Sequence, residues 1–239
     1  KAGNTVKEEV PFSVNRFGSS YKCLSDKLMG SYIATPESIT INEYNVDALD
    51  TSKAKVSVIL DGKEIKLDSS LVSVKETKKD DKYVYTYSID KGAFTKDGKY
   101  LIQVYSAAKE GAKYSSVSEE YSFVLDSKAP ELIISGVYSN TSYKDSSRRV
   151  TIDVRDTTDI KTLDVYLNNN IIKKKNDNGV YSFDMPEGTK QNIKVVASDM
   201  AGNSTTSEVK DITITSNWWV YLISQVWFKI LIIIISLIV

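Results

Sequence analysis

Histidine is absent from the 239 residues of this chain, and cysteine occurs once, at Cys23. Without imidazole there is no histidine base and no histidine metal ligand, which excludes Ser/His/Asp and Cys/His hydrolases and the usual zinc sites. A single cysteine also excludes a disulfide within the chain. The neighbours of Cys23 are polar and offer its thiol no partner chemistry, so we interpret it as structural and expect no catalytic residue.

An excess of charge of either sign is missing as well, because 31 basic residues are balanced by 31 acidic ones. This balance gives no indication of nucleic acid as a partner. Lysine and aspartate are scattered over the first 215 residues, as is typical of solvated strands and loops. The length and the hydrophobic share of 41% fit one large globular domain or two small ones.

Tryptophan and long apolar runs are absent from the body of the chain and are concentrated at its end. The segment from Trp218 to Val239 holds all three tryptophans and has four polar residues, Ser224, Gln225, Lys229 and Ser236. As a helix it would be about 33 Å long, enough to cross a bilayer core of about 30 Å. Tryptophan also favours the membrane interface. We therefore predict a transmembrane anchor at residues 217–239.

Lys229 is difficult to place in such a span, because a cation at the bilayer centre costs about 2.5 to 3.5 kcal/mol. If Trp218–Phe228 lies in the interface instead, the apolar remainder from Ile230 is about 15 Å long and too short to cross. On that interpretation the anchor is truncated and the natural chain continues beyond Val239.

Between residues 37 and 215 hydrophobic residues alternate with polar ones, a pattern typical of half-buried strands. Clear examples are Ile39–Ile41, Val56–Leu60, Tyr83–Ile89, Val150–Val154, Leu163–Leu167 and Ile193–Ala197. Asp61-Gly62, Asp97-Gly98 and Asn178-Gly179 between them are turn signals. No amphipathic helical repeat precedes Trp218, so the pattern predicts an all-β sandwich.

The predicted strands occur in two copies. Val56–Lys63 matches Leu163–Asn170, and Ser118–Leu125 matches Ser207–Ile214. The offset falls from 107 to 89 residues because the first copy has a longer central hairpin, around Leu71 to Tyr87. We predict one domain at 16–127 and a second at 128–216, with the extended Lys128-Ala129-Pro130 segment at the junction.

Residues 1–15 repeat the end of such a unit. Lys7–Asn15 parallels Ser118–Asp126, and Ala2-Gly3-Asn4-Thr5 parallels Ala201-Gly202-Asn203-Ser204. We interpret residues 1–15 as the last hairpin loop and final strand of a preceding repeat, most of which is missing. The Ala-Gly-Asn tripeptide is interpreted as a turn, with glycine free to take the left-handed conformation.

The segment Val195–Ser204, together with Phe12–Ser19 and Asp126–Pro130, resembles bacterial immunoglobulin-like repeats of large Gram-positive surface proteins. The resemblance covers nearly all of residues 1–217. It implies tandem immunoglobulin-like β-sandwiches outside the cell and no catalytic residue. The first full unit departs from the pattern at Ala107–Ala112, where the Asp-x-Ala-Gly-Asn turn is expected.

One acidic constellation is a candidate metal site. Asp153, Asp156 and Asp159 lie at and after the second strand of the second unit, Asp199 begins its last hairpin loop, and Asp126 lies in the junction. In a sandwich of this type the two loops share the end at which the unit begins. Asp126, Asp156, Asp159 and Asp199 are therefore calcium candidates. The favoured interpretation is that these aspartates cap turns through their own backbone and that no metal or cofactor is bound.

The sequence therefore predicts a non-catalytic stalk. Tandem immunoglobulin-like modules would present distal domains from a bacterial cell surface, held by a single C-terminal membrane helix. The main alternative is an adhesin-type module that binds glycan or a host protein. For that role Tyr83, Tyr85 and Tyr87 are candidates for sugar stacking, although core packing is favoured. A third possibility is an accessory region of an upstream enzyme.

Overall fold

The computed structural model describes residues 18–79, 81–109, 116–175 and 179–238. Within these ranges the chain divides into two compact units. The first consists of residues 18–31 and 36–125, and the second of residues 32–35 and everything after Leu125. The repeat end predicted for residues 1–15 lies outside the described residues.

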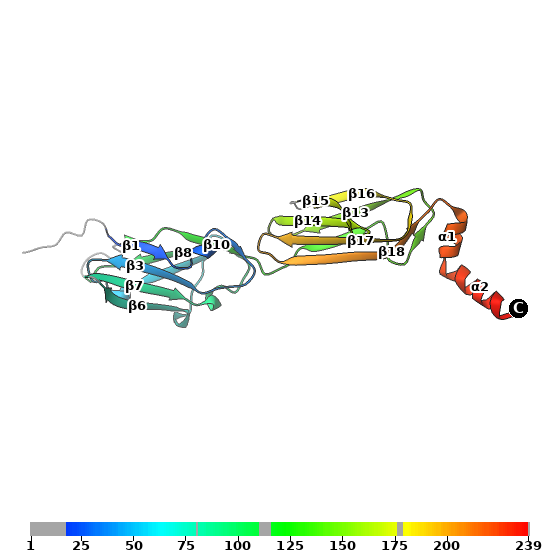
Figure 1. Cartoon of the computed structure of the whole chain (residues 1–239). Helices are drawn as coiled ribbons and strands as arrows, with labels where there is room; N and C mark the ends of the chain where they lie inside the picture. Colours follow the sequence, from blue (N-terminus) through cyan, green and yellow to red (C-terminus); the bar gives the residue numbers. More distant parts are fainter. Residues whose placement is uncertain (1–17, 80, 110–115, 176–178, 239) are drawn as a thin grey trace, which may run out of the picture. The chain divides into compact units, whose positions relative to one another are not determined.

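The described residues before Asp126, with the short strand at Tyr32–Ile33 included, form a sandwich of two sheets (Figure 1). One sheet has the strand order β1-β3-β7-β6, and the other has the order β2-β10-β8-β4-β5, with β9 added beside β8. The strands are β1 (Ser20–Cys23), β2 (Tyr32–Ile33), β3 (Ile39–Asn45), β4 (Lys55–Leu60), β5 (Lys63–Glu64), β6 (Val72–Lys79), β7 (Lys82–Ile89), β8 (Gly98–Ser106), β9 (Ser116–Val117) and β10 (Tyr121–Leu125).

Short 3-10 turns connect several of these strands at Asp26–Leu28, Thr51–Lys53, Ser69–Leu71 and Lys91–Ala93. Three of the turns begin after an aspartate, Asp50, Asp68 or Asp90, whose carboxylate accepts the backbone N–H two residues on. Much of the scattered aspartate in this unit therefore satisfies local backbone groups.

The second unit repeats the architecture with β11 (Glu131–Ser135), β12 (Ser142–Tyr143), β13 (Ser147–Arg155), β14 (Ile160–Leu167), β15 (Asn170–Lys175), β16 (Gly179–Pro186), β17 (Gly188–Asp199) and β18 (Ser204–Ile214). Its sheets have the orders β11-β13-β16 and β12-β18-β17-β14-β15 (Figure 1). The larger sheets of the two units have matching strand orders, in which β4, β8 and β10 correspond to β14, β17 and β18. Both units are immunoglobulin-like β-sandwiches.

The additional strand of the first unit is β6, which pairs with β7 from Val72 opposite Ile89 to Lys79 opposite Lys82. It is the longer central hairpin expected around Leu71 to Tyr87. The departure expected at Ala107–Ala112 lies only partly within the described residues. There Ala107 is buried and Ala108 forms an isolated bridge with Leu49.

Both cores form without tryptophan or a disulfide. In the first unit Phe94, Tyr100 and Phe123 contact one another with ring centroids 5.1 to 5.2 Å apart, partly edge to face. The second core is mostly aliphatic and includes Val150, Ile152, Leu163, Val165, Ile193, Val195 and Ile212. These are the alternating positions of the sequence, so the period-two pattern predicts the inward face correctly.

A buried carboxylate joins the two sheets of the first unit. Glu43 on β3 is fully buried and accepts hydrogen bonds from Tyr21 (3.0 Å) and Ser106 (2.6 Å) on Oε1 and from Tyr87 (2.6 Å) on Oε2. Burial raises the pKa of Tyr21 to about 12 and also raises the pKa of Tyr87. Both phenols therefore remain protonated donors at neutral pH, which a buried carboxylate needs.

Replacing Tyr87 by Phe should destabilise the first unit by about 1.5 to 3 kcal/mol, because Oε2 of Glu43 would lose a hydrogen bond inside the core. The measurement is urea unfolding followed by circular dichroism. Tyr83→Phe on the same strand is the matched control, since Tyr83 is only half-buried, and it should change stability by less than about 0.5 kcal/mol. Equal effects of the two substitutions would contradict the role given to Glu43.

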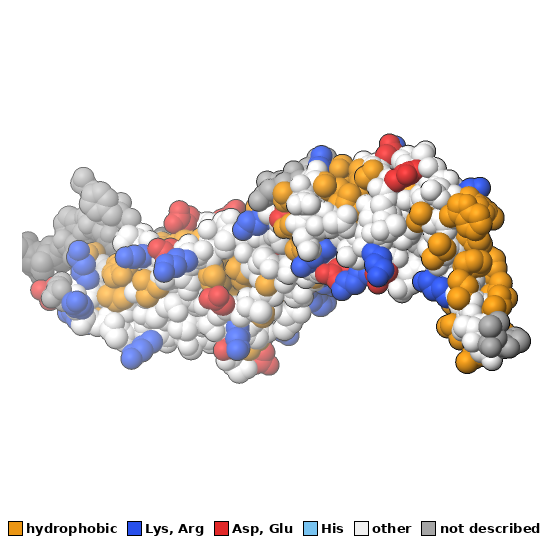
Figure 2. All heavy atoms as spheres, turned by 45° about the vertical axis from the view of Figure 1, so that its right-hand side comes forward, with side chains coloured by type: hydrophobic (Ala, Val, Ile, Leu, Met, Phe, Trp, Pro, Cys, Tyr) orange, Lys and Arg blue, Asp and Glu red, His pale blue; other side chains and the backbone are white. Residues whose placement is uncertain are grey.

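Two helices follow β18, α1 (Trp218–Ser224) and α2 (Val226–Ile238). Asn217 caps α1 by accepting the N–H groups of Trp219 (2.9 Å) and Val220 (3.3 Å). Hydrophobic side chains cover the visible face of the pair (Figure 2). No single helix among the described residues is long and apolar enough to cross a membrane. Helices α1 and α2 meet the length and hydropathy test only when they are counted together, and they are bent by 75° relative to each other.

Candidate functional sites

Three carboxylates of the second unit meet where that unit begins. Oxygen atoms of Asp126, Asp156 and Asp199 all lie within 4.8 Å of one another. Asp126 follows β10 directly, Asp156 follows β13, and Asp199 ends β17. Asp126 and Asp199 are 1% and 0% exposed, and Asp156 is partly buried. The topology therefore brings together three of the four calcium candidates chosen from the sequence.

The fourth candidate, Asp159, is not part of this group. Its side chain is exposed, and its backbone carbonyl accepts the N–H of Met200 (3.2 Å). Asp153 also lies apart, because it forms a two-contact ion pair with Arg155 on the surface of β13. Asp153 lies within β13, whereas Asp159 lies in the loop between β13 and β14.

Asn203 binds the segment Asp126–Pro130 at the start of the second unit, which we call the linker, to this carboxylate group. Its side-chain amide donates to the backbone carbonyls of Asp126 (2.7 Å) and Lys128 (3.0 Å) and to Oδ2 of Asp199 (2.8 Å). Gly202, at φ +93°, allows the tight turn that brings Asn203 back toward Asp199. The Ala-Gly-Asn tripeptide is thus a turn, as predicted, but its asparagine also holds the start of the unit in place.

Two further contacts hold the same segment. Thr158 donates its hydroxyl to Oδ2 of Asp126 (2.7 Å), and Thr205 donates to the carbonyl of Pro130 (2.6 Å). Reasoning from the sequence missed Asn203, Thr158 and Thr205 as linker contacts. The repeated tripeptide was the available signal for Asn203, whereas no pattern in the sequence pointed to the two threonines.

The carboxylate oxygens differ in how well they are satisfied. Oδ1 of Asp199 accepts the N–H of Asn203, and Oδ1 of Asp156 accepts the N–H of Thr158. Oδ2 of Asp156 is buried and has no hydrogen-bond partner in the described structure. Two like charges at such distances repel by about 3 to 4 kcal/mol at an effective dielectric constant near 20. A cation among the three carboxylates would remove both the repulsion and the unsatisfied oxygen.

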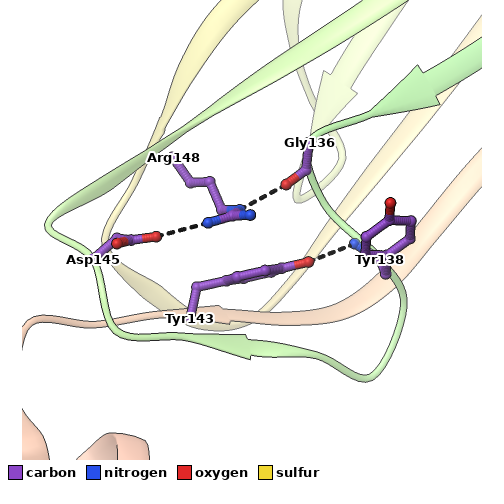
Figure 3. A network of polar contacts seen from close by, with 5 residues as sticks. All are labelled: Gly136, Tyr138, Tyr143, Asp145 and Arg148. Atoms are coloured by element: carbon purple, nitrogen blue, oxygen red, sulfur yellow. Dashed lines mark hydrogen bonds and ion pairs between the residues drawn. The ribbon is translucent and has the colours of Figure 1, made fainter.

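At the opposite end of the second unit, polar contacts hold the loop between β11 and β13, which we call the braced loop (Figure 3). The guanidinium of Arg148 lies over the ring of Tyr143, 3.8 Å from its centroid. It donates to the carbonyl of Gly136 (2.6 Å) and pairs with Asp145 (2.9 Å), while the Tyr143 hydroxyl accepts the N–H of Tyr138 (2.9 Å). These contacts fix β12, which pairs in parallel with the last residues of β18.

The braced loop also contacts the first helix. Lys144, next to Tyr143, places its ammonium 4.9 Å from the ring centroid of Trp218. The first turn of α1 is therefore held by its Asn217 cap and by a cation–π contact from the sandwich.

Other candidates from the sequence occupy structural positions. Cys23 is buried, and burial raises the pKa of its thiol, as is typical of an unreactive cysteine. Tyr85 and Tyr87 are 0% and 1% exposed, so the sugar-stacking role considered for them is wrong and the favoured core packing is confirmed. Tyr83 is half-buried and stacks on Tyr85 with ring centroids 6.3 Å apart.

Comparison with protein-family models finds no match, and neither does comparison with curated protein sequences. Among solved structures the chain is similar to the fibronectin(III)-like modules of Clostridium thermocellum CbhA, with a TM-score of 0.36 and 17% identity over 82% of this chain and 94% of that one. It is also similar to Dpr2 Ig1-Ig2, solved in complex with DIP-Theta Ig1-Ig3, with a TM-score of 0.27 and 12% identity over 84% of this chain and 100% of that one.

A third similar structure is dimeric latent PorU from Porphyromonas gingivalis, with a TM-score of 0.32 and 9% identity over 84% of this chain and 20% of that one. At such scores the likeness carries no argument about function. The class of the protein, a pair of immunoglobulin-like sandwiches followed by an apolar helix pair, rests on the strand order described above.

Replacing Asn203 by Ala should release the linker, because the carbonyls of Asp126 and Lys128 would lose their donor. We expect a loss of about 1 to 2 kcal/mol in the stability of the second unit and faster tryptic cleavage after the exposed Lys128. Mass spectrometry of the fragments measures the cleavage rate. Asn170→Ala, at an exposed position of the same unit, is the control. Unchanged cleavage in Asn203→Ala would contradict the role given to this amide.

Proposed function

We propose that the chain is the non-catalytic, membrane-proximal stalk of a bacterial cell-surface protein. Its immunoglobulin-like modules lie outside the cell and present distal domains, and its C-terminal helix pair attaches it to the membrane. The observation that supports this proposal is that the first residues of the second unit are held by its own loops. Asp126 is the first residue after the first unit, and its backbone and side chain are both bound by the second unit. A spacer is stiffer when the segment at the start of a module is held in this way than when that segment is a free coil.

Calcium bound by Asp126, Asp156 and Asp199 would complete this junction. Oxygen ligands lie 2.3 to 2.6 Å from calcium, so oxygens on opposite sides of one ion are at most about 5 Å apart. The carboxylate group meets that limit, because one oxygen from each of the three residues lies within 4.8 Å of the other two. Calcium would bind the linker residue Asp126 to the ends of β13 and β17, with the backbone turns already in place.

The adhesin alternative lacks a comparable observation. Two of the three tyrosines considered for sugar stacking are buried, and the remaining one packs on its neighbour. An accessory region of an enzyme would use the same stalk, so that alternative concerns what the stalk presents.

Calcium should raise the melting temperature of the second unit. With the affinities typical of extracellular modules, about 10 mM calcium would contribute about 1.4 to 2.7 kcal/mol, which corresponds to at least about 5 °C. Asp156→Asn should abolish this response and, without calcium, should be at least as stable as the wild type because one charge is removed. Asp159→Asn is the matched control and should keep the response. A wild type that does not respond to calcium would disprove the metal site.

The stalk itself is tested by the spread of distances between the two units. Spin labels would be placed at the exposed positions Val46 and Val180 in a Cys23→Ala background, and their separation measured by electron spin resonance. We expect a narrow distribution in calcium and a broader one after chelation or in Asp156→Asn. A distribution that is broad in every condition would contradict a semi-rigid stalk, and one that is narrow in every condition would remove only the role of calcium.

A further inference from the structure

A pocket of about 650 Å³ lies between the end of the second sandwich and the helix pair. One wall is polar and comes from the sandwich, with Ser142, Thr189 and Lys190. The facing wall is apolar and comes from the helices, with Val220 and Ile223. The pocket also includes Lys229 of α2, so each wall contributes one lysine.

The bend in the helix pair explains how Lys229 reaches this position. In one continuous helix Lys229 would lie in the middle of the apolar segment, where its charge is costly. The helix is interrupted between Ser224 and Val226 and turns by 75°. Lys229 therefore lies in the first turn of α2, beside the sandwich, and all nine residues of α2 beyond it are apolar except Ser236.

An irregular backbone conformation places Lys190 at the pocket. It has a positive φ of +53°, in an irregular stretch of β17 where the pairing with β18 shifts between Gly188 and Gln191. Its backbone N–H donates to the hydroxyl of Thr213 (3.3 Å), which fixes the turn, while its side chain is exposed and lines the pocket. Within the described parts of the chain neither Lys190 nor Lys229 takes part in an ion pair.

We propose that this pocket binds the headgroup of an anionic phospholipid, an inference that rests on the proposed attachment of the helix pair to a membrane. The ammonium groups of Lys190 and Lys229 contact the phosphate, and the hydroxyls of Ser142 and Thr189 supply further donors. Asp211 also lines the pocket, so two positive charges act against one negative charge.

The apolar wall favours a lipid over a free phosphate ion. Val220, Ile223 and Val226 would contact the glycerol and the first methylene groups of a lipid, whereas inorganic phosphate would leave them uncovered. Tryptophan favours the headgroup region of a bilayer, and Trp218 in the first turn of α1 is held to the sandwich by its cation–π contact with Lys144.

The test is the binding of the full chain to vesicles of phosphatidylcholine alone and to vesicles with about one third phosphatidylglycerol. A juxtamembrane lysine strengthens binding to anionic lipid about fivefold. Lys190→Gln and Lys229→Gln should each reduce the preference for phosphatidylglycerol by about that factor, and the double variant by about 25-fold. Lys210→Gln, at the same end of the unit but paired with Glu208, is the matched control and should change it less than about twofold.

The outcomes separate the two proposals. A chain that binds neither vesicle would disprove the membrane attachment and the lipid site with it. Equal binding to both vesicles, or an equal effect of Lys210→Gln, would leave the attachment intact and overturn the lipid site.

A soluble lipid gives a second readout, since all three tryptophans belong to the helix pair. Short-chain phosphatidylglycerol should change their fluorescence in the wild type and not in the double variant. The same change produced by inorganic phosphate would show an anion site without lipid recognition and would overturn the proposal.

Discussion

The antiparallel pairing of β17 with β18 is the constraint on which both ends of the second unit depend. The ladder runs from Gly188 opposite Ile214 to Ser198 opposite Ser204. At the Ser198–Ser204 end, the turn between the two strands holds Asp199 and Asn203 against the linker. At the Gly188–Ile214 end, β18 leads into the Asn217 cap of α1. A shift in its register would therefore displace both candidate sites at once. Because one face of the ladder is buried, a one-residue slip would expose Ile193 and Val195 and is strongly disfavoured.

The strands could be predicted from the sequence because burial on one face imposes a period of two, and few other structures produce that pattern. The segments that match in sequence occupy the same place in the sheet orders of their units, although the sheet order itself was not predicted. The predicted single transmembrane helix is corrected by the structure. Hydropathy and length describe Trp218–Val239 as one segment, but they do not register that the chain breaks near Gln225, where the backbone leaves the helical conformation.

Contacts that depend on several loops were only partly predictable. Three of four calcium candidates meet because their loops share one end of a sandwich, which topology alone determines. Which aspartate of the β13–β14 loop points inward is decided by local backbone angles, and the sequence carries no separate signal for Asp156 over Asp159. The contact between Arg148 and Tyr143 was also missed, because cation–π stacking produces no periodic pattern in the sequence.

The balanced net charge of the chain illustrates a more general limit of composition. Zero net charge excludes long-range attraction by the whole molecule, yet it is a sum over groups that are screened from one another beyond about 10 Å. In the second unit, the net charge adds an acidic group at one end to a basic group at the other. Three carboxylates gather where the linker enters, whereas Lys190 and Lys229 line the pocket beside the helices. Each end can therefore attract a ligand of opposite charge, a cation at one and a phosphate ester at the other. In the proposed surface stalk, the first site would stiffen the start of the module and the second would hold the base of the stalk on the bilayer.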